Sequence, residues 1–487
     1  MTYDLVVIGA GPAGEKGAAR AAYFGKRVAI VDPNARPGGI AVSTAGIPTK
    51  TLREGAVYLS GLGQTAHHFP TPNAPDPWQL LKTRRLEVSD LMTKAVERNL
   101  LRHGIDRIRG TARLLPGRRV EVETPTGERS ILDTDAVLLT SGSTPAHPKG
   151  VPMDDPDVHD SETILDIERT PESLLVLGGG SLGCEYASIF AALGARVMLV
   201  DARPQLLPAL DVEMARVLAE SFNGMGIRVL TGAEVLGVTR RDGALVVELA
   251  DGRSLTVAKI LVAAGRRPCT DGLGLAEAGV ETDPAGWVRV DERYATTAPR
   301  VFAAGDVIGV PGLASVAMEQ ARVAVSHAFE FEFGATTVTD RFCPTYVFSI
   351  PEVAWVGLTE AQARVREIDF EVGRASFGGN AKARISGFID GSLKLVFRLP
   401  DRVLLGVHIV GEAATELIHL GQFVMHEGGT IDRFVEATFA VPTRTEAYKY
   451  AAYDGLLRLE RRAPAAAQPR QAGAPRAKVV RSVYTDR

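Results

Sequence analysis

The pattern of apolar and polar positions predicts the same succession of elements in two parts of the chain. In "DLVVIGAGPAG", a short apolar run leads into Gly9, Gly11 and Gly14. A helical stretch follows in "EKGAARAAYFGK", and a second apolar run ends at Asp32. A continuous apolar run of this length, bounded by glycines, is typical of a buried strand. The pattern therefore predicts a strand–turn–helix–strand unit at the start of the sequence.

The glycine spacing of this unit indicates a dinucleotide-binding turn. In a G-x-G-x-x-G turn, the first glycine allows a tight bend, the second lets the backbone approach a pyrophosphate, and the third lets the helix pack closely. The helix N-terminus then faces the phosphates. Asp32 lies where a carboxylate can accept hydrogen bonds from ribose hydroxyls. A glycine turn without a ligand is the alternative, and the complete strand–helix–strand–acid context disfavours it.

The unit occurs a second time. "SLLVLGGGSLGCEYASIFAALGARVMLVD" carries Gly178, Gly180, Gly183 and Asp201, each 169 residues after its counterpart in the first unit. Such self-similarity is expected from an internal duplication. Two dinucleotide sites in one chain suggest that two nucleotides are held together, so that electrons or a hydride can pass between them.

Further glycine turns follow apolar runs at 136–148, 260–268 and 300–309, the last of which is broken by Gly305 and Asp306. Ligands of open α/β sheets bind beyond the carboxyl ends of the strands. Asp306 is therefore a candidate to bond a ribityl or phosphate group of a cofactor. A turn or helix N-cap aspartate is the alternative, and we favour the ligand. Residues 220–260 alternate apolar and polar positions, which predicts a hairpin excursion.

Length, charge and cysteine content narrow the class of protein. The 487 residues are too many for one core and suggest about three domains. A net charge of -3 indicates neither a nucleic-acid partner nor a membrane surface. No apolar run is long enough for a membrane span, and no basic leader precedes the first strand. The widely separated Cys184, Cys269 and Cys343 predict no metal site and no local redox pair, and favour a cytoplasmic location.

Together these motifs resemble the pyridine nucleotide–disulfide oxidoreductase family up to about residue 460. The resemblance implies an α/β fold with two Rossmann-like dinucleotide-binding domains and a C-terminal α+β dimerisation domain. It also implies FAD on the first unit, NAD or NADP on the second, and a homodimer. The expected divisions are 1–150 and 271–340 for the FAD domain, 151–270 for the NAD(P) domain, 341–460 for the interface domain, and 461–487 for a disordered basic tail.

The resemblance also implies a set of site residues. The FAD ligands are expected among Gly9, Gly11, Gly14, Asp32, Lys50, Ala112, Ser141, Gly142 and Asp306. The nicotinamide coenzyme is expected among Gly178, Gly180, Gly183, Asp201, Arg203 and Gly265. Lys50, Glu185 and Glu446 are the expected catalytic residues, with Glu446 reaching across the dimer.

The stretch "GGIAVSTAGIPTK", residues 38–50, matches the active-site helix of this family but lacks its chemistry. The two positions that hold redox cysteines in disulfide reductases hold Ala41 and Gly46. The histidine of the C-terminal H-P-T motif is replaced by Val441, while Glu446 remains. Because dithiol–disulfide exchange needs a thiolate and a proton acceptor, we expect no disulfide reductase activity.

Hydride transfer between a nicotinamide and a flavin needs stacking and positioning, not a protein thiol. Lys50 matches the lysine beside the reactive flavin nitrogen, where a cation stabilises the negative charge of reduced flavin. Glu185 matches the glutamate that pairs with it, and burying either charge alone would be costly. Two solvated helix residues are the disfavoured alternative. Ser181, where many relatives carry an aromatic residue, suggests an open nicotinamide pocket.

The sequence predicts a coenzyme site that accepts both NAD and NADP. Asp201 favours the free ribose diol of NAD, and Arg203 could reach the 2′-phosphate of NADP by bidentate bonds. Taken alone, a solvated surface charge is an equally weighted alternative for Arg203. Segments 405–422 and 438–459 are most similar to the soluble pyridine nucleotide transhydrogenases. The main hypothesis is therefore an FAD-dependent NAD(P) transhydrogenase. The alternatives are a quinone or dye reductase or oxidase, with an acceptor beside the small residues at 41, 45 and 46, and a non-catalytic flavoprotein.

Overall fold

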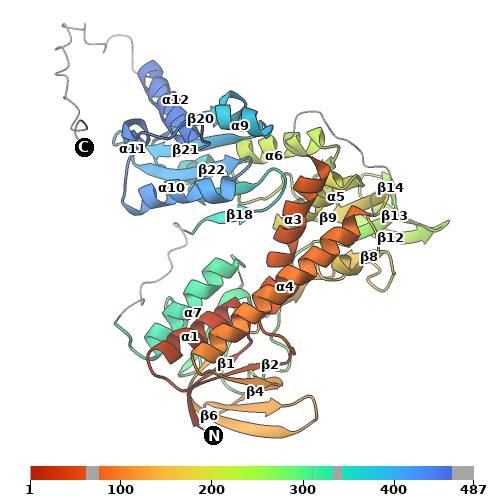
Figure 1. Ribbon diagram of the computed structural model, residues 1–487, viewed down its shortest axis with the longest axis vertical. Helices are drawn as coiled ribbons and strands as arrows, with labels where there is room; N and C mark the ends of the chain where they lie inside the picture. The colour runs from red at the N-terminus through yellow and green to blue at the C-terminus, as the bar shows by residue number, and fades with distance from the viewer. Residues whose placement is uncertain (1, 62–75, 310, 333–342, 463–487) are drawn as a thin grey trace, which may run out of the picture.

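The computed structural model describes residues 2–61, 76–309, 311–332 and 343–462. Three sheets form its framework, and the helices pack between and around them (Figure 1). The predicted α/β fold class is confirmed. None of the described helices is both long and apolar enough to cross a membrane. The predicted disordered tail lies outside the described residues from 463 onward, and the last helix continues to Arg462.

The first sheet contains the first glycine turn. Its strands are β1 (Thr2–Ile8), β2 (Val28–Asp32), β3 (Asp106–Arg109), β4 (Thr111–Leu115), β5 (Arg119–Glu123), β6 (Arg129–Leu139) and β17 (Val301–Ala303). Strands β3, β2, β1 and β6 run parallel in that order, and β17 also pairs in parallel with β6. Residues 301–303 thus return to the first sheet after the second unit is complete.

Burial on both faces explains the continuous apolar run of β1. Leu5 and Val7 pack under helices α1 (Pro12–Tyr23) and α7 (Ala314–Ala328), whereas Val6 and Ile8 join the core on the opposite face. The two helices lie side by side over the sheet (Figure 1). Alanine and glycine residues on their buried faces allow this close approach. Their close packing fixes the start of α1 beneath the first glycine turn.

The second sheet contains the second glycine turn. Its parallel strands are β8 (Val158–Asp160), β9 (Ser173–Leu177), β10 (Arg196–Asp201), β11 (Arg228–Thr231) and β15 (Lys259–Val262). The predicted excursion at 220–260 is present as three antiparallel strands, β12 (Val235–Arg241), β13 (Ala244–Leu249) and β14 (Ser254–Val257). The helices of this unit are α5 (Ser181–Ala192) and α6 (Val212–Gly224). A two-stranded ribbon of β7 (Ser143–Pro145) and β16 (Arg266–Pro268) joins the two units.

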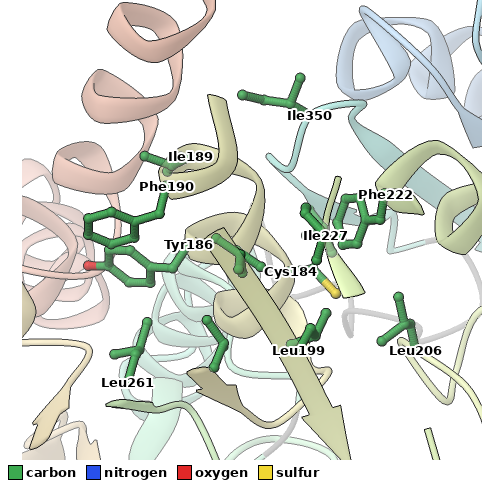
Figure 2. Packing of buried hydrophobic residues seen from close by; sticks show 14 of the residues in the cluster. Cys184, Tyr186, Ile189, Phe190, Leu199, Leu206, Phe222, Ile227, Leu261 and Ile350 are labelled. Carbon is green, nitrogen blue, oxygen red and sulfur yellow. The ribbon is translucent and has the colours of Figure 1, made fainter. Parts of the chain in front are cut away.

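Cys184 belongs to the core of the second unit. Figure 2 shows its side chain on α5 among apolar residues that include Phe222 and Ile227. The thiol is fully buried, and burial raises its pKa far above the ordinary value. A thiol held in its protonated form is a poor nucleophile, so Cys184 is an inert packing residue.

The C-terminal sheet is antiparallel, with the order β18 (Thr345–Val347), β19 (Val353–Gly357), β22 (Leu404–Val410), β21 (Ser392–Arg398) and β20 (Phe370–Ser376). Its helices are α8 (Glu360–Val365), α9 (Ala381–Ser386), α10 (Ala414–His426), α11 (Asp432–Glu436) and α12 (Glu446–Arg462). A buried ion network joins this domain to α6. The Lys394 ammonium lies 2.8 Å from carboxylate oxygens of both Asp211 and Glu213 and 2.5 Å from Glu360.

Two helices of the first unit connect all three parts. They are α3 (Ile47–Ser60) and α4 (Pro77–Arg102), preceded by the short α2 (Gly39–Ser43). Asp76 caps α4 by accepting the amide of Trp78, whose buried ring stacks on Phe190 of the second unit at 5.1 Å. Helix α3 packs against both α4 and α5. The "GGIAVSTAGIPTK" segment therefore leads directly into a helix that contacts the second unit.

Candidate functional site

A cavity of about 2850 Å³ lies between the first and second units and extends to the C-terminal domain. It gathers the segments that the sequence indicated: both glycine turns, residues 38–50, the turns at 141–145 and 263–267, and Asp306. Ala112, Ser181 and Gly265 also line it. Segments hundreds of residues apart thus meet at one site.

In the first glycine turn, two glycines have no space for a side chain and the remaining one faces open space. A Cβ on Gly9, whose φ is +107°, would lie 2.3 Å from the carbonyl oxygen of Thr140, and one on Gly14 would lie 1.9 Å from that of Gly9. A Cβ on Gly11 would meet nothing nearer than the Cα of Gly39, 4.0 Å away. The first and third glycines are therefore required by the fold, and the second leaves free space at the N-terminus of α1.

The second turn repeats this arrangement. A Cβ on Gly178, with φ +113°, would lie 2.4 Å from the Ala263 carbonyl oxygen, and one on Gly183 would lie 1.8 Å from that of Gly178. Gly180 has nothing within 4 Å of its ideal Cβ. Two helix N-termini, each behind an open glycine, suit the pyrophosphates of FAD and of a nicotinamide dinucleotide.

Asp32 holds the first turn in place. Its buried carboxylate accepts the backbone amides of Ala10 at 2.7 Å and Asn34 at 2.8 Å, one on each oxygen. Each oxygen retains a second acceptor direction for a ribose hydroxyl. The residue thus suits its predicted role and has a structural one as well.

Asp201 accepts the equivalent backbone amides and is also bonded by a side chain. It accepts the amides of Gly179 and Arg203, and the Arg203 guanidinium also donates to both of its oxygens. Burial alone would raise the pKa of Asp201, but the bonds from Arg203 and the amides outweigh it and hold the pKa below its usual value. The Arg203 side chain is 48% exposed and borders the cavity.

Lys50 and Glu185 form the predicted pair. The Lys50 ammonium lies 2.9 Å from both carboxylate oxygens of Glu185 and 3.1 Å from the hydroxyl of Thr49. Glu185 is buried on α5 and also accepts the backbone amide of Phe348 at 3.0 Å. The pair therefore joins α3 of the first unit, α5 of the second and a strand end of the C-terminal domain.

Ala41 and Gly46, at the positions of the family's redox cysteines, lie against each other. The backbone of Ala41 occupies the space beside Gly46. An ideal Cβ on Gly46 would lie 2.5 Å from the carbonyl oxygen of Ala41 and 2.8 Å from its Cα. We expected small residues here to leave room for an acceptor. At Gly46 that room is occupied by the backbone of Ala41.

Asp306 is part of a polar cluster at the inner end of the cavity. Ser143 donates to its carboxylate at 2.8 Å, and Arg266 donates to the Ser143 hydroxyl and carbonyl, each at 2.7 Å. Ser143 lies in the 140–143 stretch that the family resemblance implies for FAD, whereas Arg266 was missed by sequence reasoning. Arg266 directly follows the predicted Gly265, so the glycine turn could have indicated it.

Several buried polar atoms of the cavity lining have no partner within the described chain. They are Thr44 Oγ1, Arg85 Nε, Ser89 Oγ, Ser141 Oγ and Arg266 Nη1. Buried polar groups are normally hydrogen-bonded, and all of these unpartnered atoms belong to residues that line one cavity. FAD, with its ribityl hydroxyls and pyrophosphate, fits this lining.

Glu446 does not join the others within one chain. It starts α12, its carboxylate accepts the Thr443 amide at 3.3 Å, and it does not line the cavity. Val441, at the position of the family histidine, is 73% exposed. The role of Glu446 across a dimer stays a prediction. The described residues hold no cluster of side chains able to bind a metal.

The chain is similar to a soluble pyridine nucleotide transhydrogenase of Mycobacterium tuberculosis (strain ATCC 25177 / H37Ra), with 39% identity over 457 residues, covering 93% of this chain and 97% of the relative. A protein of the same name from Pseudomonas paraeruginosa is 37% identical over 463 residues, covering 94% and 99%.

Among solved structures, the Cu(II) complex of the HOCl-induced flavoprotein disulfide reductase RclA from Escherichia coli superposes with a TM-score of 0.84 at 27% identity, covering 93% of this chain and 99% of that one. Residues 343–452 match the dimerisation domain of the pyridine nucleotide-disulphide oxidoreductases, and residues 3–321 match their main family model. The chain therefore belongs to the pyridine nucleotide-disulphide oxidoreductase family.

Proposed function

We propose that this oxidoreductase is an FAD-dependent NAD(P) transhydrogenase that moves a hydride between NADPH and NAD⁺ without a redox disulfide. One observation carries the proposal. Two dinucleotide cradles open into a single cavity beside the Lys50–Glu185 pair, while the segment at 38–50 has neither a thiol nor space for a side chain at Gly46. The names of the relatives support the same activity.

Some residues of the site would bind the cofactors, and others would stabilise charge. The first turn and the α1 N-terminus would hold the FAD pyrophosphate, and the second turn and the α5 N-terminus that of NAD(P)H. Bound FAD supplies a hydride acceptor that can return the hydride to a second nicotinamide. Lys50 would stabilise the negative charge of a reduced flavin, and Glu185 would keep the ammonium in place.

Both coenzymes would use the second cradle in turn, because the described residues offer one such site. Asp201 suits a ribose diol, and the exposed Arg203 guanidinium can leave it to bind a 2′-phosphate. This pair therefore supports the acceptance of NADH and NADPH alike. We further propose a homodimer formed through the dimerisation domain, with Glu446 facing the partner's cavity, and a cytoplasmic location.

A coenzyme-exchange assay tests the proposal. Purified protein with bound FAD is given NADPH and a thio-analogue of NAD⁺, and separately NADPH and a soluble quinone. Rapid reduction of the analogue with slow quinone turnover is expected. Dominant quinone turnover would instead support a quinone reductase, and no turnover with either would support a non-catalytic flavoprotein. Lipoamide should not be reduced, and clear lipoamide turnover would refute the argument from Ala41 and Gly46.

A further inference from the structure

We propose that Phe348 is a positioning residue for the Lys50 ammonium, a role that rests on the proposed flavin chemistry. The proposal comes from a three-way contact. The Phe348 amide donates to Oε1 of Glu185 at 3.0 Å, and the Lys50 ammonium lies 5.0 Å from the centre of the Phe348 ring. The ring also borders the cavity.

The backbone contact changes what Glu185 can do to Lys50. A carboxylate bonded through both oxygens to one ammonium offsets most of its positive charge. When Oε1 also accepts the Phe348 amide, part of the carboxylate charge is engaged by the protein backbone. More of the Lys50 charge then remains available to a reduced flavin in the cavity.

The ring contact restricts where the ammonium can lie. Glu185 and Thr49 bind Lys50 through hydrogen bonds. The electron-rich face of Phe348 attracts the same cation from another direction. A long, flexible lysine held from several sides loses the freedom to swing away from the cavity.

The position of Phe348 is itself fixed from two domains. Two residues further on, the Ile350 amide donates to Ser188 of α5 at 3.0 Å. On the other side, the Tyr346 ring packs edge-on against Phe348 at 5.6 Å, and its hydroxyl bonds Ser315 of α7 at 2.9 Å. The C-terminal domain thus presents Phe348 from a segment anchored to both dinucleotide units.

The test measures the midpoint potential of bound FAD by reductive titration with dithionite and a reference dye, which needs no nicotinamide. In Phe348→Leu and Phe348→Met, we expect a lower potential, because reduced flavin loses part of its stabilisation. The limiting rate of flavin reduction by NADPH should fall about 5- to 20-fold, with little change in the NADPH concentration at half-maximal rate. Phe348→Tyr, which keeps the ring, should behave like the wild type.

Phe370→Leu is the matched control, since Phe370 is also a half-buried ring in the same domain beneath a cation, Arg364, at 5.5 Å. It should leave the potential unchanged. Wild-type potential in both ring-removing variants, or an equal shift in the control, would overturn the proposal. Failure of the wild type to exchange hydride between coenzymes would refute the transhydrogenase activity, while the potentials would still decide the role of Phe348.

Discussion

The first and second dinucleotide units share individual backbone hydrogen bonds at positions 169 residues apart. The Gly9 amide donates to the Val31 carbonyl at 2.8 Å, and the Gly178 amide donates to the Val200 carbonyl at the same distance. The clashes that exclude a side chain at the first and third glycines also agree within 0.1 Å. What the duplication preserves is therefore the shape of the phosphate cradle.

The correspondence is interrupted after one particular backbone bond. The Gly38 amide donates to the Ala10 carbonyl, and at the equivalent positions Leu207 donates to Gly179. Beyond this bond the first unit enters α2 and α3, which carry Lys50, and the second unit enters α6. The segment at 38–50 thus begins directly after this shared bond. The correspondence resumes later in the chain, where the Thr140 and Ala263 amides donate to the Ile8 and Leu177 carbonyls, each at 2.8 Å.

A second difference lies at the end of the second strand. In the first unit Asp32 accepts only backbone amides, those of Ala10 and Asn34, whereas in the second the Arg203 side chain also bonds Asp201. An arginine beside the acid suits the binding of a 2′-phosphate. The two cradles therefore share their backbone and differ in the side chain beside the acid.

Alanine substitutions at the third glycine of each turn should have the largest effects. In Gly14→Ala and Gly183→Ala, the added methyl meets a backbone oxygen at less than 2 Å, so we expect losses of about 3 kcal/mol or more in the free energy of unfolding. Gly14→Ala should lose FAD. Gly183→Ala, if purified, should retain FAD yet resist reduction by NADPH. Thermal unfolding and flavin absorbance measure both effects.

Gly11→Ala and Gly180→Ala provide the matched controls. Their φ values, −73° and −79°, and the space around them accept a methyl group. The apoproteins should unfold like the wild type, with FAD affinity weakened about tenfold in Gly11→Ala and the NADPH KM raised about tenfold in Gly180→Ala. Equal destabilisation at all four glycines would contradict the division between packing and ligand positions.

Arg203→Ala should remove the side-chain difference between the two cradles and weaken the binding of NADPH. We expect the KM for NADPH to rise about tenfold or more, because a charged hydrogen bond to phosphate is lost, with the KM for NADH little changed. Steady-state kinetics with each coenzyme measure this. Arg196→Ala, at the opposite end of the same strand and paired to the exposed Glu172, is the control. An equal rise for both coenzymes would remove Arg203 from phosphate recognition.

The repeated unit was predictable because its constraints are local. Gly9 and Gly178 need a positive φ, and the strand, helix and acid follow at fixed spacing. The Lys50–Glu185 pair was predicted from the family resemblance, not from spacing. Phe348 had no local signal, because its contacts with Lys50 and Glu185 are made only when three domains meet. Nor could spacing show that the backbone of Ala41 fills the place of a side chain at Gly46.

The contact between Gly46 and the backbone of Ala41 leads to a prediction about the segment at 38–50. Gly46→Cys should not restore a redox pair, even with Ala41→Cys, because its Cβ would contact the carbonyl at residue 41 at 2.5 Å. We expect a loss of about 1–3 kcal/mol in unfolding free energy and no lipoamide reduction. Ala41→Cys alone should be tolerated. Thiol titration and an activity assay measure the outcome, and a double variant that reduces lipoamide would show that the segment can reopen.

The smallest expected effect concerns the acid beside Arg203. The folded-state pKa of Asp201 is depressed, so its stabilising contribution is present above the unfolded value near 4 and is lost as the pH falls through the folded value. Removing Arg203 should bring that pKa back toward its usual range, so the melting temperatures of apo Arg203→Ala and wild type should differ at pH 7 and converge below pH 4. The difference should not exceed about 1–2 °C, because Arg203 is half exposed and its pairing is screened by solvent.

Asn34→Ala in the first unit, where only the backbone bonds the acid, should show a difference that does not change with pH. Convergence in both variants would mean that the two acids differ less than their side-chain partners indicate.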